Sequence, residues 1–183
     1  MSAYQAYLPE PEQRLPKLVL EIRPALPGDV PALAALVQQR HGGDLARISS
    51  QLVAELDSYG STAIVYRLLF VAIHAGSLAG FARLMHTDKS ERYRWPAPPG
   101  WYGMGLVVDP QLRRRGVATA LAAHRFAWLQ ARQVPMLYSF ANSRNLSSVA
   151  YHQAQGFCET GRAAGYLDVD FDGGEGILFV RQL

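Results

Sequence analysis

The sequence predicts an α/β (α+β) domain in which one mixed central sheet of six or seven strands is flanked by about four helices. Segments with helical spacing alternate with short apolar strand segments along most of the chain. A strand–helix–strand run near the C-terminus requires a crossover connection and so indicates a parallel pair of strands. The 183 residues, 49% apolar and 18% charged, suit a single domain with a sizeable core.

The N-terminal half is expected to form a strand, two helices and a hairpin. Residues 1–17 are polar and proline-rich, which is typical of a loosely held tail or a strap before a domain spanning 18–183. Asp29 is placed to cap the first helix, whose apolar residues recur every three or four positions. The expected elements are strand Leu18–Ile22, helices Val30–Arg40 and Leu45–Tyr59, and strands Ala63–Tyr66, Leu68–His74 and Leu78–Met85.

The C-terminal half alternates strands with helices after a connection at His86–Gly100 that is long for a compact domain. The expected elements are strand Trp101–Val108, helix Arg115–Arg132, strand Met136–Ala141, helix Leu146–Gln155, and strands Phe157–Arg162 and Ile177–Arg181.

The turn between the strand at 101–108 and the following helix carries the clearest chemical signal. It contains Arg113, Arg114 and Arg115, followed by Gly116 and Ala118. A turn that leads into a helix presents unpaired N–H groups at the positive end of the helix dipole. Small residues let a phosphate approach the backbone, and arginines add charge-assisted hydrogen bonds. The turn therefore predicts a pyrophosphate-binding site.

Two other interpretations of this turn are less favoured. Three consecutive arginines also occur on solvated faces and in nucleic-acid-binding patches, but the formal net charge is only +3, so we expect no nucleic-acid partner. The glycine-rich motifs of dinucleotide-binding and P-loop proteins are absent from this turn.

The Arg113-x-x-Gly-x-Ala motif resembles the Gln/Arg-x-x-Gly-x-Gly/Ala signature of the GNAT superfamily of N-acetyltransferases. A Val-Val-Asp-Pro strand end precedes it, and Asn145-x-x-Ser with a later Gly-Phe pair follows, as in that family. The order of the elements is similar from about Leu18 to the end of the chain.

This resemblance implies a fold, a co-substrate and a reaction. Parallel strands around Val108 and Met136–Phe140 would splay apart in the middle of the sheet and hold the thioester of acetyl-CoA in the gap. The acetyl group would pass directly to a primary amine of a small molecule or peptide, with no metal ion. An N–H near Val107 or Val108 would polarise the thioester carbonyl.

The resemblance also implies which residues contact the cofactor. Pantetheine would pair with the backbone of Leu106, Val107 and Val108, and Asn145 would contact the cofactor further on. The pyrophosphate would bind at the turn formed by Arg113, Arg114, Arg115, Gly116, Val117, Ala118 and Thr119.

The sequence departs from the family pattern at the catalytic positions. Relatives often carry a tyrosine general acid seven residues after the asparagine, where this chain has His152. Histidine donates protons near neutral pH, so His152 is a candidate acid, or else a partly exposed helix residue without a catalytic role. No glutamate base occurs in Trp101–Leu106, which leaves Glu175, a water chain or a neutral amine as alternatives. A non-catalytic acyl-CoA sensor with the same fold is therefore the alternative function.

The remaining features concern location and partners. A lone cysteine, Cys158, cannot form an internal disulfide and is expected to be a buried small hydrophobe, which favours a cytoplasmic protein. The N-terminus does not resemble a signal peptide, and we expect no membrane partner. A homodimer is left open. Asp168, Asp170 and Asp172 either attract a cationic amine or form a solvated turn.

Overall fold

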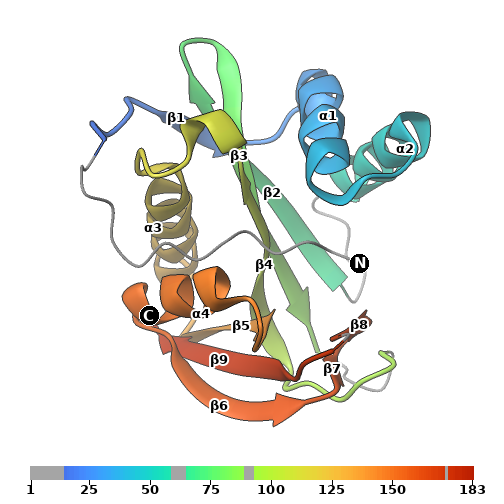
Figure 1. Cartoon of the computed structure of the whole chain (residues 1–183), viewed down its shortest axis with the longest axis vertical. Coiled ribbons are helices and arrows are strands. Elements are labelled where there is room, and N and C mark those ends of the chain that lie inside the picture. The colour runs from blue at the N-terminus through green and yellow to red at the C-terminus, as the bar shows by residue number, and fades with distance from the viewer. Residues whose placement is uncertain (1–14, 59–64, 89–92, 172) are drawn as a thin grey trace.

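The computed structural model describes residues 15–58, 65–88, 93–171 and 173–183. Seven strands form one mixed sheet in the order β1-β2-β3-β4-β5-β9-β6, and β7 pairs with β8 separately (Figure 1). The strands are β1 (Glu21–Pro24), β2 (Val65–His74), β3 (Ser77–Thr87), β4 (Gly100–Val108), β5 (Met136–Asn142), β6 (Cys158–Ala163), β7 (Gly165–Tyr166), β8 (Val169–Asp170) and β9 (Gly176–Gln182).

Four α-helices accompany the sheet in the described part of the chain. They are α1 (Val30–His41), α2 (Leu45–Asp57), α3 (Val117–Gln130) and α4 (Leu146–Ala154), with short 3-10 turns η1 (Pro27–Asp29) and η3 (Pro110–Leu112). The expected mixed sheet with about four helices is confirmed.

Several boundaries differ from those expected. The two strands expected at 63–66 and 68–74 are one strand, β2, although residues 63 and 64 lie outside the described residues, as does Tyr59 of the second expected helix. Strands β7 and β8 were not expected, because two residues each are too short to show a periodic pattern.

The parallel pair does not lie where the C-terminal strand–helix–strand run placed it. Strands β5 and β6, which flank α4, run in the same direction, but β9 lies between them and pairs antiparallel with both. The hydrogen-bonded parallel pair is instead β4 with β5, connected through α3. Strand β9 therefore lies between β5 and β6, the two strands that run parallel because α4 connects them as a crossover.

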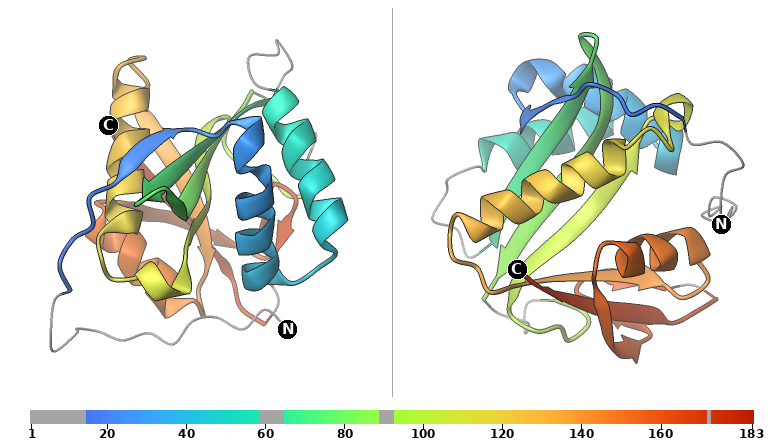
Figure 2. Two further views of the ribbon diagram at one scale, coloured as in Figure 1. Left: turned by 90° about the horizontal axis from the view of Figure 1, so that it is seen from above. Right: turned by 90° about the vertical axis from the view of Figure 1, so that its left-hand side faces the viewer.

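The two parallel strands separate soon after they meet. Their ladder consists of Trp101 opposite Leu137 and Tyr102 opposite Tyr138, while β4 continues to Val108 and β5 to Asn142. Figure 2 shows the resulting two arms, β1–β4 and β5–β9–β6, diverging from this junction. The splayed parallel strands of the sequence analysis are therefore confirmed.

Helices cover the β1–β4 arm on both faces, with α1 and α2 on one side and α3 on the other (Figure 1). Phe81 of β3 packs in the core beneath α1 and α2, whereas Leu84 packs in the core that contains Leu121 and Leu129 of α3. Because both faces are covered, the central strands are apolar on both sides instead of alternating with polar residues.

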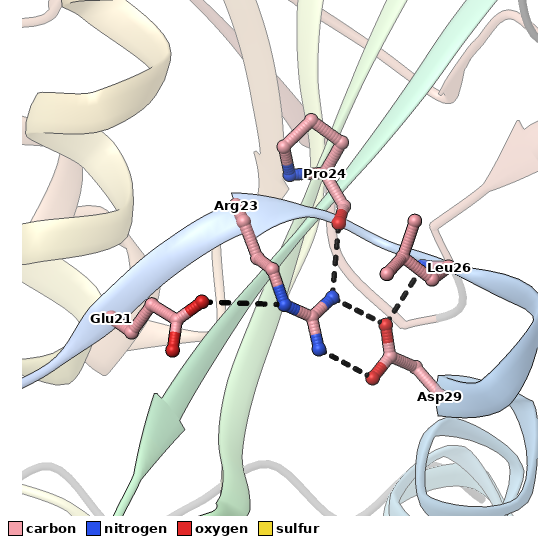
Figure 3. Close-up of polar contacts among 5 residues, drawn as sticks. All are labelled: Glu21, Arg23, Pro24, Leu26 and Asp29. Atoms are coloured by element: carbon pink, nitrogen blue, oxygen red, sulfur yellow. Dashed lines mark hydrogen bonds and ion pairs between the residues drawn. The ribbon is translucent and has the colours of Figure 1, made fainter.

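An ion pair fixes the path from β1 into α1 (Figure 3). Arg23 donates from Nη1 and Nη2 to the two oxygens of Asp29, at 2.7 and 2.9 Å. Asp29 also accepts from the backbone N–H of Leu26 at 2.7 Å. The hydrogen bond from Arg23 holds the pKa of Asp29 below its usual value.

Within the described residues, no helix has the length and apolar run needed to cross a membrane.

Candidate functional site

A β-bulge interrupts β4 next to the gap between the sheet arms. Phe81 pairs with Val107 and Arg83 with Met104, so Gly105 and Leu106 together face the single residue between Phe81 and Arg83. Gly105 has a left-handed φ of 49°, a conformation that glycine adopts without steric cost. Bulges redirect a strand and the groups beyond it.

The bulge is followed by backbone groups that face the gap. The N–H of Asp109 donates to the carbonyl of Ala79 at 2.9 Å, so this residue and Val107 direct their backbone groups toward β3. Because the direction alternates along a strand, the N–H and carbonyl of Val108 face the opposite side, where β5 has diverged. Of the three strand residues expected to pair with pantetheine, Val108 has the clearest geometry for it.

The arginine turn leads directly into α3. Arg114 and Gly116 have left-handed φ values of 62° and 85°, and Gly116 is the N-cap residue. The helix begins at Val117, two residues later than expected. Ala120 donates to the carbonyl of Gly116 at 2.9 Å, so the N–H groups of the first turn, 117–119, precede the helical ladder. These are donors at the positive end of the helix dipole.

The N-terminal segment adds a cation to this turn that the sequence did not reveal. The N–H of Leu18 donates to the carbonyl of Arg115 at 3.1 Å. A Cβ added at Gly116 would lie 3.4 Å from Cγ of Lys17. This segment therefore lies along the turn. Its hydrogen bond is accepted by the carbonyl of Arg115 and does not involve a backbone N–H of the turn. Lys17 lies about a hundred residues before the turn, so no spacing rule connects them.

Asn145 begins the helix that carries the candidate acid. Its Oδ1 accepts from the N–H of Ser148 at 3.2 Å, which makes it the N-cap of α4. The residue thus sets the start of the helix that carries His152, two turns further along. Its expected contact with the cofactor stays a prediction, as does the role of the turn residues.

His152 is buried between α4 and the sheet, 7% exposed. Its Nδ1 lies 2.7 Å from the carbonyl of Ser148, and its Nε2 lies 2.8 Å from Oγ of Ser139. The ring stacks on Phe179 with centroids 4.7 Å apart. Ser139 Oγ is also 2.9 Å from the carbonyl of Gly103, so the chain of contacts ends on β4 just beyond the last parallel pair.

The protonation state of His152 decides which of these contacts is a hydrogen bond. The carbonyls of Ser148 and Gly103 only accept, so all three contacts are satisfied together only if both ring nitrogens carry protons. Burial lowers the pKa of His152, and the positive charge of Arg125 lowers it further, against the Ser148 contact, which raises it. The lowered pKa favours a neutral ring at pH 7. Its single proton lies on Nδ1 or on Nε2, so one of the three contacts is then not a hydrogen bond.

A buried arginine lies behind this network. Arg125 of α3 is 4% exposed and donates from Nη1 to the carbonyl of Arg83 at 3.2 Å. Its Nε has no hydrogen-bond partner among the described residues. Burial lowers the pKa of Arg125, while Tyr151 beside it raises that pKa. Tyr151 of α4 faces α3, with its hydroxyl 3.5 Å from the carbonyl of Ala118.

Two other groups named from the sequence are occupied elsewhere. The side chain of Glu175 is 63% exposed and lies 3.6 Å from Arg162 in an ion pair. Asp170 accepts from Arg94 Nη1 and Trp95 Nε1, both at 2.8 Å. Asp172 lies outside the described residues.

The expectation that Cys158 is buried was wrong. It begins β6, the last strand of the sheet order, and its side chain is exposed. Among the described residues, no three His, Cys, Asp or Glu side chains are grouped as a metal site would require.

Comparison with known proteins places the chain in a family. The sequence profile of the acetyltransferase (GNAT) family matches residues 47–157. Since this is more than half of the 183 residues, the chain belongs to the GNAT acetyltransferase family. A comparison with curated protein sequences gives no match.

Solved structures share the fold. A putative GNAT acetyltransferase from Desulfovibrio desulfuricans is 18% identical with a TM-score of 0.69, covering 90% of this chain and 99% of its own. A ribosomal-protein-alanine N-acetyltransferase from Brucella melitensis is 22% identical with a TM-score of 0.65, covering 89% and 99%. The PaiA N-acetyltransferase of Thermoplasma acidophilum, solved with coenzyme A, is 13% identical with a TM-score of 0.65, covering 91% and 100%.

Proposed function

We propose that this protein transfers an acetyl group from acetyl-CoA directly to a primary amine of a small molecule or peptide. The observation that carries the proposal is the position of the arginine turn. Gly116 and the first turn of α3 follow the strand whose Val108 groups face the gap between β4 and β5. A pyrophosphate at the turn and a thioester in the gap would thus be joined by pantetheine along one strand edge.

The cofactor contacts follow from this placement. The N–H groups of 114–119 and the cations of Arg113, Arg115 and Lys17 would bind the pyrophosphate. The N–H of Val108 would donate to the thioester oxygen as negative charge develops there. The Thermoplasma relative solved with coenzyme A supports the choice of cofactor.

The amine would attack the thioester carbonyl carbon, and collapse of the intermediate would break the carbon–sulfur bond. The nitrogen then loses one proton and the departing sulfur gains one. We assign this transfer to His152 acting through the Ser139 hydroxyl, which lies beside Gly103 at the start of the gap. A neutral ring is suited to accept the proton first and donate it afterwards. Glu175 is not needed in this scheme.

A non-catalytic acyl-CoA sensor is the second candidate. The observation that favours it is the engagement of both ring nitrogens of His152 by Ser148 and Ser139, which leaves the ring no direct route to the gap. The two functions share cofactor binding and differ only in turnover.

Thermal unfolding with and without acetyl-CoA tests the shared part. A ligand that binds only the folded protein at 100 times its Kd adds about 2.7 kcal/mol of stability, so Tm should rise by several degrees. Release of free CoA with a panel of amines and peptides then separates the two candidates. Binding without turnover would support the sensor, and an unchanged Tm would contradict both.

A further inference from the structure

A pocket of about 580 Å³ opens on the face of the sheet that α1 and α2 cover. It lies between these helices and strands β2 and β3. Its apolar wall comes from Val37, Ile48 and Leu52. The charged groups among its described lining residues are Glu55 of α2, Arg67 of β2 and Arg83 of β3, so positive charge exceeds negative by one there.

The ion pair in this pocket orients Arg83. Nε of Arg83 lies 2.9 and 3.1 Å from the two carboxylate oxygens of Glu55. The side chains are 25% and 12% exposed, so the pair is shielded from water on most sides. The guanidinium carbon also lies 4.8 Å from the centre of the Phe81 ring. Because Nε makes the bonds to Glu55, the terminal amino groups extend past that carboxylate.

The terminal amino groups connect the pocket with the bulge in β4. A Cβ added at Gly105 would lie 3.0 Å from Nη1 of Arg83. Gly105 itself is exposed and precedes Leu106, the first strand residue assigned to the cofactor. Arg83 therefore lies both in the pocket and beside the bulge that precedes the strand segment assigned to the cofactor.

We propose that this pocket binds the acceptor and that the acceptor carries a carboxylate close to its amine, as an amino acid does. This inference rests on the proposed function. Arg83 and Arg67 would bind the carboxylate, since a guanidinium matches a carboxylate with two parallel hydrogen bonds. The amine would then lie toward the bulge at Gly105. Glu55 is a positioning residue that holds the Arg83 guanidinium in place.

A purely cationic acceptor fits these groups less well. Among the described residues that line the pocket, positive charge is in excess, and the one carboxylate, Glu55, is engaged by Arg83. Two of the three acidic residues named from the sequence as possible cation attractors are also engaged, and the third, Asp172, lies outside the described residues. Asp170 binds Arg94 and Trp95, and Asp168 accepts from the N–H of Arg94 at 3.3 Å.

The test compares free L-amino acids with the corresponding amino-acid amides as acceptors, measured by CoA release. The two sets share amine and side chain and differ in the carboxylate. We expect kcat/KM to be at least about tenfold higher for the best acid than for its amide. A tenfold ratio corresponds to a difference of about 1.4 kcal/mol. Arg83→Gln should reduce this ratio to about one, and Arg83→Lys should retain part of it, since the charge remains.

Arg23→Gln is the matched control. The Arg23–Asp29 pair has side-chain exposures of 30% and 14%, close to those of Arg83 and Glu55, and belongs to neither substrate site. This variant should keep the wild-type acid-to-amide ratio. If Arg83→Gln does not fold, Arg67→Gln, at an exposed position, should lower the same ratio by about half or more.

The outcomes separate this inference from the proposed function. Amides that react as well as acids, or an Arg83→Gln variant that keeps the preference, would overturn the inference while leaving acetyl transfer intact. A rise in Tm with acetyl-CoA but no turnover of any acid would also overturn it. Failure of acetyl-CoA to bind would instead reject the proposed function, and the inference with it.

Discussion

The two faces of the β1–β4 arm differ in how they would recognise a ligand. On the α3 side the groups are main-chain N–H donors from one short segment, Val108 to Thr119, shaped by the left-handed residues Arg114 and Gly116. On the α1–α2 side they are side chains from three elements, such as Glu55 and Arg83, which lie 28 residues apart. Main-chain recognition depends on local conformation, whereas the pocket depends on how distant elements pack.

This difference suggests a division of roles. Backbone donors at a helix start bind phosphate whatever the surrounding side chains are, so they suit a cofactor common to many proteins. A pocket built from side chains changes with single substitutions, so it suits the acceptor. The following predictions test whether proton transfer and cofactor binding depend on residues of α3, α4 and the turn before α3.

The largest expected effect concerns His152. His152→Phe keeps an aromatic ring against Phe179 but removes both nitrogens, so kcat should fall about 100-fold, as expected for loss of a general acid–base. Ser139→Ala should lower kcat to a similar degree, because the proposed path runs through its hydroxyl. The Kd for acetyl-CoA, measured by calorimetry, should change less than about threefold. A tenfold change in Kd would correspond to about 1.4 kcal/mol of binding free energy.

His124→Phe is the control for this pair. His124 of α3 packs edge-on against Phe70 of β2, with centroids 4.8 Å apart. It takes no part in the proposed path, so kcat should stay at the wild-type value. A normal kcat in His152→Phe would assign the proton transfer to another group and remove the main role proposed for α4.

Gly116→Val should produce the next largest effect. Its φ of 85° lies in the left-handed region, where a side chain costs about 1–2 kcal/mol, and the β-branched valine would also meet Lys17. The Kd for acetyl-CoA should rise about tenfold or more. Gly76→Val introduces the same kind of strain, at φ 80°, in open space at the β2–β3 turn. Equal losses of affinity in both variants would show that strain alone, not the turn, is responsible.

The smallest expected effect is on the pH dependence of stability. Burial lowers the pKa of His152 in the folded protein, with Arg125 adding to the effect. Below the ordinary histidine pKa of about 6.5, the unfolded chain binds a proton that the folded protein does not. The free energy of unfolding should therefore fall as pH drops from about 6.5 toward the lowered pKa, and then level off.

Urea unfolding between pH 5 and 7.5 measures this slope. His41 and His124 also have pKa values lowered by burial, so His152→Phe should reduce the slope without abolishing it. Stability that increases toward acid would show that His152 is charged in the folded protein, with all three of its network contacts satisfied.

The sequence predicted the parts of the molecule that are encoded locally. Arg114, Gly116 and the following helix start lie within a few residues of each other, so their spacing alone indicated the turn. The insertion of β9 between β5 and β6 could not be predicted in this way, because strand order depends on contacts between distant segments.

The pocket beneath α1 and α2 and the histidine network could not be predicted from the sequence for the same reason. The helical pattern of α2 is set by its apolar residues and gives no sign that Glu55 faces Arg83. Ser139 is a single hydroxyl in an apolar strand, and only the fold shows that it lies between His152 and Gly103. Lys17 was assigned to a tail because proline and polar residues surround it.

The contact of Lys17 with Gly116 has a practical consequence for fluorescent labelling. Leu15, two residues earlier, is 50% exposed, so an environment-sensitive dye attached there would lie near the turn proposed to bind the pyrophosphate, and its fluorescence would test that proposal when acetyl-CoA is added.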